Sequence, residues 1–350
     1  MLIQHLLNLN PKIKNSTFEI NKFSIIIPLF NRPEEVRELL QSLTGQTQKN
    51  FEVIIIEDGS KDKSDKIIEE FDNQLDIQYL YKKNSGPGPS RNFGMKHAKG
   101  DFFIILDSDV ILPSAYIKTV EEYLKKNPVD AYGGPDAAHP DFTALQKAID
   151  FAMTSFLTTG GIRGKAEKLE KFRPRSFNMG ISKKVFQKTG GFSNMRFGED
   201  MDLSIRIIKD GFQTALIKEA FVYHKRRNTL KQFFKQIFNS GIARIHLYQK
   251  HPKSLKIVHF FPLLFILGLI SSLILLIFSI PYVFWIYILY FLLIFIFSSI
   301  QYRSIKTGLI SVLTSLEMLW AYASGFLYGI WKIFIRKQKK FHKFEKNFYE

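Results

Sequence analysis

The sequence contains no cysteine among its 350 residues. Disulfide bonds, zinc–thiolate sites and thiol nucleophiles are therefore excluded. Internal repeats and low-complexity tracts are also absent, so the sequence is not a repeat array. Residues 1–20 lack the charged-then-apolar pattern of a secretory signal, because the apolar run Leu2–Leu9 is short and interrupted by polar residues. We expect no secretory cleavage.

Acidic residues are outnumbered, since 32 Asp and Glu stand against 49 Lys and Arg and give a formal net charge of +17. This excess predicts an anionic partner, which is a nucleic acid, a nucleotide or the anionic face of a membrane. A nucleic acid is disfavoured, because the cations are spread along the chain without a basic patch interleaved with aromatic residues. We therefore expect no nucleic-acid partner.

Charged residues become scarce after residue 256, where the composition changes to Phe, Leu and Ile. At about 20 residues per crossing, the run 257–300 suffices for two membrane helices and exceeds what a soluble core needs. We expect spans at about 257–279 and 282–301, separated by Ser279-Ile280-Pro281. A third apolar stretch, 308–335, carries Glu317 and precedes the basic tail 336–350.

Lysine and arginine flank each apolar stretch, and such cations prefer the cytoplasmic side of the plasma membrane. Placing every flank there requires an even number of crossings. We therefore favour a multi-pass protein with two spans, an interfacial or re-entrant helix at 308–335, and the preceding domain in the cytoplasm. Three spans, which would put the tail outside, are the alternative. Gly325 and Gly329 lie one helical turn apart and predict close packing of the third helix against a neighbour.

Before residue 250, buried strand patterns alternate with helix patterns. A continuous apolar run bounded by Gly or Pro is typical of a strand that is buried on both faces, as in a parallel sheet. The alternation predicts an α/β domain with a mostly parallel sheet flanked by helices. The expected strands are Phe23–Phe30, Phe51–Ile56, Ile77–Tyr81 and Phe102–Leu106.

Two of these strands end in acid, with Asp58 after the second and Asp107 and Asp109 after the fourth. Ligands of open parallel sheets bind beyond the carboxyl ends of the strands, so we expect these acids at one edge. Asp107 and Asp109 suit a divalent cation that also holds phosphate oxygens, and Asp58 suits a base or ribose. A solvated turn is the alternative. The glycine-rich loop 84–90 has neither P-loop nor G-x-G-x-x-G spacing, which disfavours ATP and NAD.

Several separate motifs, taken together, resemble a family 2 glycosyltransferase with a GT-A fold. The resemblance implies a GT-A nucleotide-diphospho-sugar transferase domain at 22–250, after an N-terminal extension 1–21 and before a membrane region 251–335 and a cytoplasmic tail 336–350. The motifs are, in order, FSIIIPLFNR, VIIIEDGSKDKS, NSGPGPSRNFGMKHAKGDFFIILDSDV and GGFSNMRFGEDMDLSIRIIKDGF.

The resemblance implies roles in a nucleotide-sugar site. The position of Asp58 contacts the nucleotide base, and the D-x-D pair, Asp107 and Asp109, binds the nucleotide and a divalent metal, Mn²⁺ or Mg²⁺. His224 resembles a histidine that relatives place near the diphosphate or the metal, although a lone histidine is more often a core or surface residue. Positions in the nucleotide pocket and its loop are matched by Pro28, Asn31 and Arg91.

The same resemblance places the chemistry at an E-D motif, with Asp200 as the catalytic base, Glu199 orienting the acceptor, and Asn178 on the acceptor side. Acids at a helix start are usually capping residues and dipole partners, which is the alternative for this cluster and for Asp202. Sugar transfer to a hydroxyl, however, needs a carboxylate that accepts the proton of the attacking group. The upstream nucleotide motifs therefore favour a catalytic Asp200.

One departure from the family pattern bears on the product. The Q-x-x-R-W motif of processive synthases is absent, since the comparable place reads Gln236-Ile-Phe-Asn-Ser240. Two spans also provide little wall for a polysaccharide channel. We expect a metal-dependent inverting hexosyltransferase that adds one or few sugars to a hydroxyl of a membrane-associated, lipid-linked glycan for the cell surface. A UDP-sugar is the expected donor from family frequency, with GDP- and TDP-sugars open.

Two other functions stay open at this point. One is transfer of a sugar to polyprenyl phosphate, whose oxygen is already anionic and needs no base, so the E-D motif argues against it. The other is a non-catalytic membrane protein that binds nucleotide or anionic lipid, which the full set of acids disfavours.

Overall fold

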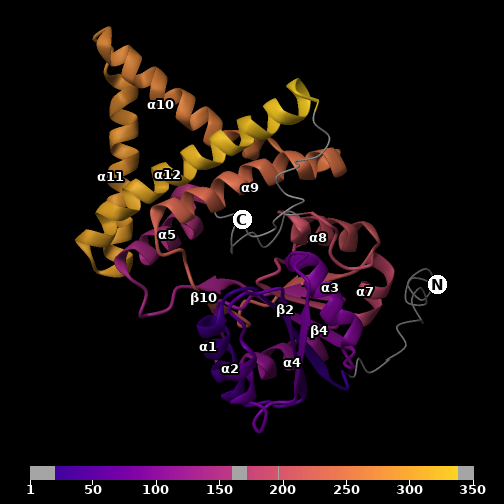
Figure 1. Ribbon diagram of the computed structural model, residues 1–350. Coiled ribbons are helices and arrows are strands. Elements are labelled where there is room, and N and C mark those ends of the chain that lie inside the picture. The colour runs from indigo at the N-terminus through magenta and orange to yellow at the C-terminus, as the bar shows by residue number, and fades with distance from the viewer. Residues whose placement is uncertain (1–19, 160–171, 196, 338–350) are drawn as a thin grey trace, which may run out of the picture.

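The computed structural model describes residues 20–159, 172–195 and 197–337 (Figure 1). Most of the expected N-terminal extension and of the basic tail lies outside the described residues. The chain forms an α/β domain, with a long helix and three further helices after it.

A seven-stranded sheet has the order β3-β2-β1-β4-β8-β6-β9. The first four strands in this order are parallel, β8 is antiparallel to both β4 and β6, and β9 is parallel to β6. The expected mostly parallel sheet is therefore confirmed. The bounds are Phe23–Leu29 for β1, Phe51–Asp58 for β2, Ile77–Lys82 for β3, Phe102–Leu106 for β4, Ala131–Gly133 for β6, Asn178–Ser182 for β8 and Thr214–Leu216 for β9.

Helices cover both faces of this sheet, and every side chain of β1, β2 and β4 is therefore buried. One face packs against α1 (Pro33–Thr44), α2 (Asp65–Glu69) and α4 (Tyr116–Lys126). The other packs against α3 (Pro87–His97), α7 (Lys183–Thr189) and α8 (Glu199–Lys209). The apolar cores on the two faces fix the strands, so the residues that follow the strand ends are held at one edge.

A smaller sheet of three strands lies beside this edge. It has the order β5-β10-β7, with β5 at Val110–Ile111, β7 at Asp136–Ala137 and β10 at Val222–His224. β10 runs antiparallel to β5, and its register places His224 opposite Val110. This pairing brings a residue from late in the domain next to the acids that follow β4.

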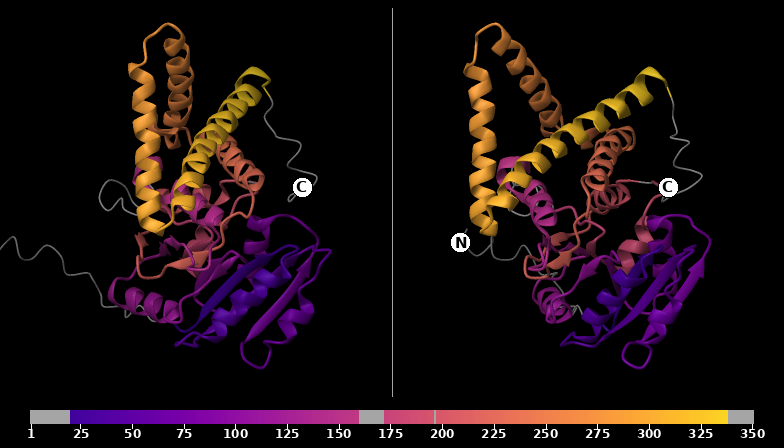
Figure 2. Two further views of the ribbon diagram at one scale, coloured as in Figure 1. Left: turned by 90° about the vertical axis from the view of Figure 1, so that its left-hand side faces the viewer. Right: turned by 60° about the vertical axis from the view of Figure 1, so that its left-hand side comes forward.

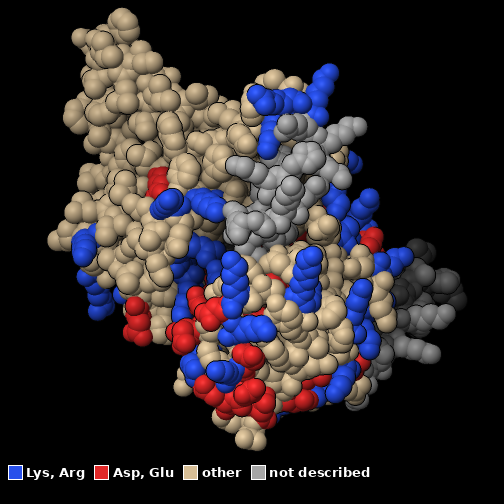
Figure 3. Space-filling view, viewed as in Figure 1, with Lys and Arg blue, Asp and Glu red and all other residues tan. Residues whose placement is uncertain are grey.

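The apolar part of the chain forms α10 (Phe261–Ile277), α11 (Tyr282–Tyr302) and α12 (Ile305–Ile330), which continues as a π-helical turn to Ile335. The three helical segments that contain them, Ile257–Ile277, Tyr282–Tyr302 and Ile305–Ile335, are long and apolar enough to cross a membrane. α10 and α11 form a hairpin that projects from the domain, whereas α12 lies across α9 (Leu230–Lys250) and α5 (Ala144–Thr154) (Figures 1 and 2). The projecting surface shows almost no charge, and Lys and Arg appear below it, toward the domain (Figure 3).

α12 differs from the hairpin in its burial. Half of its most apolar window (50%) is buried inside the protein, against 11% for each hairpin helix. Glycines permit this packing, as a Cβ on Gly325 would lie 2.0 Å from the Phe238 carbonyl oxygen and one on Gly329 would lie 3.1 Å from Ile245. The close packing expected of these glycines is confirmed, and the neighbour is α9. The number of crossings stays a prediction.

Candidate active site

The carboxyl ends of β1, β2 and β4 lie at one edge of the sheet because these strands are parallel neighbours. Asp58 ends β2, Asn31 follows β1, and Asp107 and Asp109 follow β4. Pro28 lies near the end of β1, beyond the residues that pair with β4, where its missing N–H removes no bond to that strand. The sequence-predicted nucleotide residues thus share the end of the sheet at which such ligands bind.

Asp58 and Asn31 organise the loops at this edge. The fully buried Asp58 carboxylate pairs with Lys82 and accepts hydrogen bonds from the backbone N–H groups of Ser85 at 2.9 Å and Gly86 at 2.7 Å. Asn31, which has a positive φ of 50°, accepts hydrogen bonds from the N–H groups of Lys61 at 2.8 Å and Asp62 at 3.1 Å. Asp58 holds the glycine-rich loop in place, and its contact with a nucleotide base stays a prediction.

Asp107, Asp109 and His224 form a candidate metal site. One ligand atom from each lies within 4.8 Å of the others. Asp109 Oδ1 is 3.2 Å from His224 Nε2 and accepts no hydrogen bond from any residue that the structure describes. A buried carboxylate oxygen without a donor is costly unless a cation satisfies it, so the site fits a divalent ion bound by oxygen and imidazole ligands.

The charge state of Asp109 suits a ligand. Burial acts to raise the pKa of Asp109, but nearby His224, Arg32 and Arg227 outweigh it and hold the pKa below the usual range. The other carboxylate oxygen accepts a hydrogen bond from Arg32 Nη1 at 2.6 Å. Asp109 is therefore ionised at neutral pH, as a metal ligand must be.

Arg91 connects this site with the E-D motif. Its guanidinium is buried and lies 2.7 Å from Asp107 Oδ1 on one side and 3.0 Å from Glu199 Oε1 on the other. The guanidinium carbon also sits 5.1 Å from the centre of the Phe192 ring. The fork of an arginine is suited to two such contacts, which a lysine does not reproduce. Arg91 thereby fixes the two acidic motifs relative to one another.

Glu199 and Asp200 begin α8, directly after Gly198, whose φ is 82°. Burial raises the pKa of Glu199 to about 7; Arg91 opposes this effect and Asp200 adds to it. Burial also acts to raise the pKa of Asp200, but Arg175 and the Met201 N–H lower it below its usual value. Asp200 Oδ2 is 2.7 Å from Arg175 Nε. At neutral pH Asp200 is therefore a carboxylate, the form that accepts a proton.

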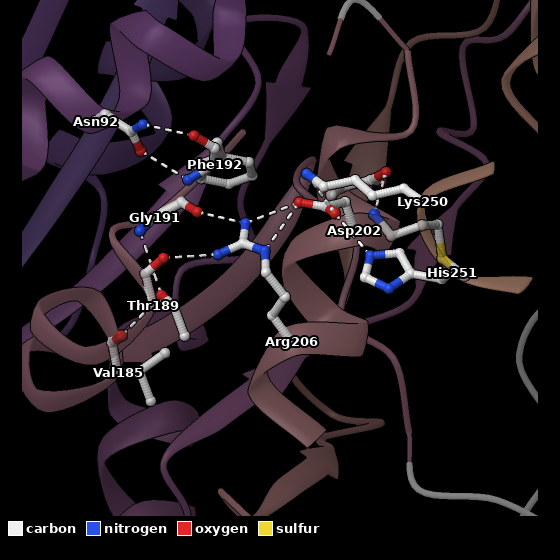
Figure 4. Close-up of polar contacts among 11 residues, drawn as sticks. Asn92, Val185, Thr189, Gly191, Phe192, Asp202, Arg206, Lys250 and His251 are labelled. Atoms are coloured by element: carbon white, nitrogen blue, oxygen red, sulfur yellow. Dashed lines mark hydrogen bonds and ion pairs between the residues drawn. The ribbon is translucent and has the colours of Figure 1, made fainter. Parts of the chain in front are cut away.

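Asp202, the third acid of this helix, has a structural environment. Its fully buried carboxylate is 2.9 Å from an Arg206 guanidinium nitrogen and 2.8 Å from both Lys250 Nζ and His251 Nε2 (Figure 4). Burial opposes ionisation, but Lys250, His251 and further donors lower the pKa of Asp202 to about 2. Arg206 also donates to the carbonyl oxygens of Thr189 and Gly191. The cluster ties the start of α8 to the end of α9.

The acceptor contact expected of Asn178 has no support in this arrangement. The side chain is fully buried, its amide nitrogen donates to the Ala220 carbonyl at 2.8 Å, and its oxygen accepts from the Tyr116 hydroxyl at 2.6 Å. Both ends of the amide are used inside the protein. Asn178 therefore links β8 to the segment before β10 rather than pointing at a ligand.

A cavity of about 550 Å³ opens beside Asp109. Arg32, Tyr223 and Arg227 are among the residues that line it, and its cations suit a phosphorylated ligand. Sequence reasoning missed Arg32 as a partner of Asp109, because the two are 77 residues apart. Arg227 follows two further cations, Lys225 and Arg226, and all three residues line the cavity.

Comparison with protein families identifies the domain. Residues 24–190 match the model described as glycosyl transferase family 2. Over these residues the chain is similar to family 2 glycosyltransferases. An uncharacterised glycosyltransferase of Haemophilus influenzae is 29% identical over 220 residues, covering 59% of this chain and 70% of that relative.

Other relatives are longer than this chain or match only a part of it. An uncharacterised glycosyltransferase of Rickettsia felis is 38% identical over 106 residues, which cover 30% of this chain and 18% of that protein. The poly(ribitol-phosphate) β-N-acetylglucosaminyltransferase TarS of Staphylococcus aureus is 33% identical over 113 residues, covering 31% of this chain and 20% of TarS. The chain thus matches less than a fifth of the length of the rickettsial relative.

Among solved structures, the mannosyltransferase PcManGT of Pyrobaculum calidifontis, in complex with GDP-Man and Mn²⁺, matches this chain with a TM-score of 0.58. The match covers 94% of this chain and 92% of PcManGT at 12% sequence identity. At this identity the likeness concerns the fold, and its coverage includes the C-terminal helices.

Proposed function

We propose that this protein is a metal-dependent inverting glycosyltransferase, which moves a sugar from a nucleotide-diphosphate sugar to a hydroxyl of a membrane-associated, lipid-linked glycan acceptor. The observation that carries the proposal is the position of Arg91 between Asp107 and Glu199, at 2.7 Å and 3.0 Å. This contact joins a site that fits a metal and a diphosphate to a pair of buried carboxylates that fits an acid–base role.

Each group at the site has a part in this reaction. Asp107, Asp109 and His224 would hold the Mn²⁺ or Mg²⁺, which offsets negative charge on the leaving diphosphate. Asp200 accepts the proton of the acceptor hydroxyl. The oxygen of that hydroxyl attacks the anomeric carbon, and the bond from this carbon to the diphosphate oxygen breaks. Attack opposite the leaving group inverts the anomeric configuration. Glu199 orients the acceptor beside Asp200.

The donor side supports a nucleotide sugar. Arg32 and Arg227 add positive charge to the cavity beside Asp109, where the diphosphate of a donor would lie. We propose a UDP-sugar as the donor, and the N-acetylglucosaminyltransferase TarS, named above, is in keeping with a hexosamine. PcManGT, the neighbour by fold, holds GDP-Man, so a GDP-sugar belongs in the same test.

The acceptor side supports a membrane location. The hairpin of α10 and α11 exposes large apolar side chains such as Leu264, Leu267, Trp285 and Leu289. Exposed apolar surface of this extent fits lipid better than water. The cations that flank the apolar helices favour the cytoplasmic side of the plasma membrane for the catalytic domain. The acceptor is accordingly proposed to be anchored in the same membrane.

A donor screen tests the proposal directly. The full chain in lipid nanodiscs is incubated with UDP-, GDP- and TDP-sugars, with Mn²⁺, Mg²⁺ or a chelator, and release of nucleoside diphosphate is measured with and without a membrane lipid extract. We expect release with one nucleotide class, dependence on the metal, and stimulation by the lipid fraction with few sugars added per acceptor. No release from any donor, or long polymeric products, would contradict the proposal.

A further inference from the structure

A cluster of cationic side chains lies beside Asp200. Arg175, from the segment before β8, contacts Asp200 at 2.7 Å, and 43% of the Arg175 side chain is exposed. α9 approaches the same place, because a Cβ on Gly198, the residue before Glu199, would lie 3.6 Å from the Cβ of Ala243. The next residue on α9 is Arg244.

One buried nitrogen of the half-buried Arg244 guanidinium, Nε, lacks a hydrogen-bond partner among the residues that the structure describes. Burial lowers the pKa of Arg244, Tyr322 of α12 opposes this, and the nearby charges of Arg175 and Arg173 lower it further. Like charges gathered in this way are stabilised by an anion that they share, and guanidinium forks bind phosphate oxygens best.

The cluster is situated where the chain turns toward the apolar hairpin. Lys256 and His259 belong to the segment between α9 and α10, and His259 is within electrostatic reach of Arg244, Arg173 and Lys256. His259 Nδ1 accepts a hydrogen bond from the Lys256 N–H at 2.9 Å, which fixes the ring. In Figure 1, α9 and α12 separate the hairpin from the α/β domain, with α8 on the domain side.

On this side the apolar residues of α9 and α12 form a core of their own. Ile242 and Ile245 of α9 pack against Phe326 of α12, and Phe260, directly before α10, packs against the same group. The Phe260 and Phe326 rings meet edge to face with 5.1 Å between their centres. The exposed apolar surface begins just beyond this core, with Phe261, Leu264 and Leu267 of α10. A ligand that fits this position has an anionic group beside an apolar chain, as a phosphorylated lipid has.

We propose that Arg175 and Arg244, together with Arg173, bind a phosphate group of the lipid-linked acceptor next to Asp200. This inference rests on the proposed function, because it names the chemistry of the acceptor for the same site. A phosphate that draws Arg175 toward itself leaves the Asp200 carboxylate free to accept the proton of a sugar hydroxyl beyond the phosphate. The lipid chain would then lie toward α9 and α12, and the sugar toward the donor cavity.

Binding to the full chain in neutral phosphatidylcholine nanodiscs tests the inference without turnover. The probes are farnesyl diphosphate and inorganic diphosphate, measured by isothermal titration calorimetry in the presence and absence of phosphatidylglycerol in the disc. Arg244→Gln is compared with Lys235→Gln, which removes the same charge from an exposed position of the same helix. We expect Arg244→Gln to weaken farnesyl diphosphate binding about tenfold or more, as loss of a charge-assisted hydrogen bond predicts, and Lys235→Gln to leave it unchanged.

The arms of this experiment separate the possible outcomes. Tighter binding of farnesyl diphosphate than of inorganic diphosphate supports a lipid source, and equal binding supports a phosphate site while removing the lipid assignment. An equal loss in both variants, or full displacement by phosphatidylglycerol, would mean general attraction to an anionic surface and overturn the inference. No binding by the unmodified chain would overturn it as well.

Two further measurements keep the result interpretable. If Arg244→Gln does not fold, Arg175→Gln removes a partly exposed member of the same cluster and is expected to give the same loss. Binding of the nucleotide donor is measured on every variant and should not change. A chain that binds farnesyl diphosphate but releases no nucleotide from any donor contradicts the proposed function and leaves the phosphate site in place.

Discussion

The guanidinium of Arg91 lies 3.0 Å from the carboxylate of Glu199, a residue 108 positions later in the chain. Through its other nitrogen the same side chain contacts Asp107 at 2.7 Å. Arg91 therefore holds the end of β4 and the start of α8 in one arrangement. The two motifs lie far apart in the sequence, so this bridge gives the candidate site its geometry.

Replacement of Arg91 tests the bridge. Removing one partner from a buried ion pair costs about 3–5 kcal/mol, since the remaining charges are left uncompensated. We expect Arg91→Ala to lower the thermal midpoint strongly, and Arg91→Lys to retain more stability but lose turnover, because an ammonium does not span both carboxylates. Arg37→Ala, at an exposed ion pair with Glu70, is the control and should change neither. Wild-type turnover in Arg91→Lys would contradict the assigned role.

The metal site is tested by Mn²⁺ titration followed by electron paramagnetic resonance. Asp109→Asn removes the charge of the buried ligand and is expected to abolish tight Mn²⁺ binding and to reduce turnover roughly a hundredfold or more, as loss of metal-based charge stabilisation implies. His224→Gln should weaken binding less. Asp101→Asn, near the other end of β4, is the control and should bind Mn²⁺ like the unmodified chain. Equal Mn²⁺ affinity in Asp109→Asn would remove this residue from the ligand set.

The raised pKa of Glu199 has a consequence for stability. Its ordinary pKa is 4.5 and its value in the folded protein is about 7, so the folded state holds a proton that the unfolded state has lost between these values. The contribution to stability is therefore full below about pH 4.5 and is lost as the pH rises to about 7, by on the order of 3 kcal/mol. Glu199→Gln, which stays neutral, should flatten this part of the curve of unfolding free energy against pH. An unchanged curve would contradict the raised pKa.

The contact between α9 and α12 is tested by a single methyl group. Gly325→Ala places a Cβ 2.0 Å from the Phe238 carbonyl oxygen, so the helices must separate. We expect a loss of about 1–3 kcal/mol, as for other overpacked interiors, measured as denaturant unfolding in nanodiscs. Leu327→Ala, on an exposed face of the same helix, is the control and should leave stability nearly unchanged. Wild-type stability of Gly325→Ala would show that α12 is not held against α9.

Local patterns were sufficient for the strands and for the acids that follow them. The run Phe102–Leu106 is apolar on both faces because helices cover both sides of β4, and the sheet then exposes Asp107 and Asp109 at its edge. The pairing of β10 with β5 brings His224 beside Asp109, and the role that the resemblance implies for it at a metal stays a prediction. The three apolar helices were likewise evident from composition, since each contains a long run of apolar residues with few charges.

Contacts between segments that are distant in the chain were not predictable from local sequence patterns. Nothing local marks Arg175 as the partner of Asp200 or Arg91 as that of Glu199, because these pairs depend on how α8 packs on the domain. Asn178 was assigned to the acceptor from its motif, yet the hydroxyl of Tyr116 and the carbonyl of Ala220 occupy its side chain. A motif fixes where a residue lies along the chain, whereas its partners are decided by tertiary packing.

Replacement of Asp200 by Asn tests whether this carboxylate accepts the proton of an acceptor hydroxyl. Transfer to the lipid-linked acceptor and binding of donor and Mn²⁺ are measured on the same preparation, with Asp210→Asn, at the exposed far end of α8, as the control. We expect transfer to fall about 10²–10⁴-fold in Asp200→Asn, with donor and Mn²⁺ binding intact and Asp210→Asn unaffected. Undiminished transfer in Asp200→Asn would contradict this role and favour an acceptor, such as a polyprenyl phosphate, that needs no base.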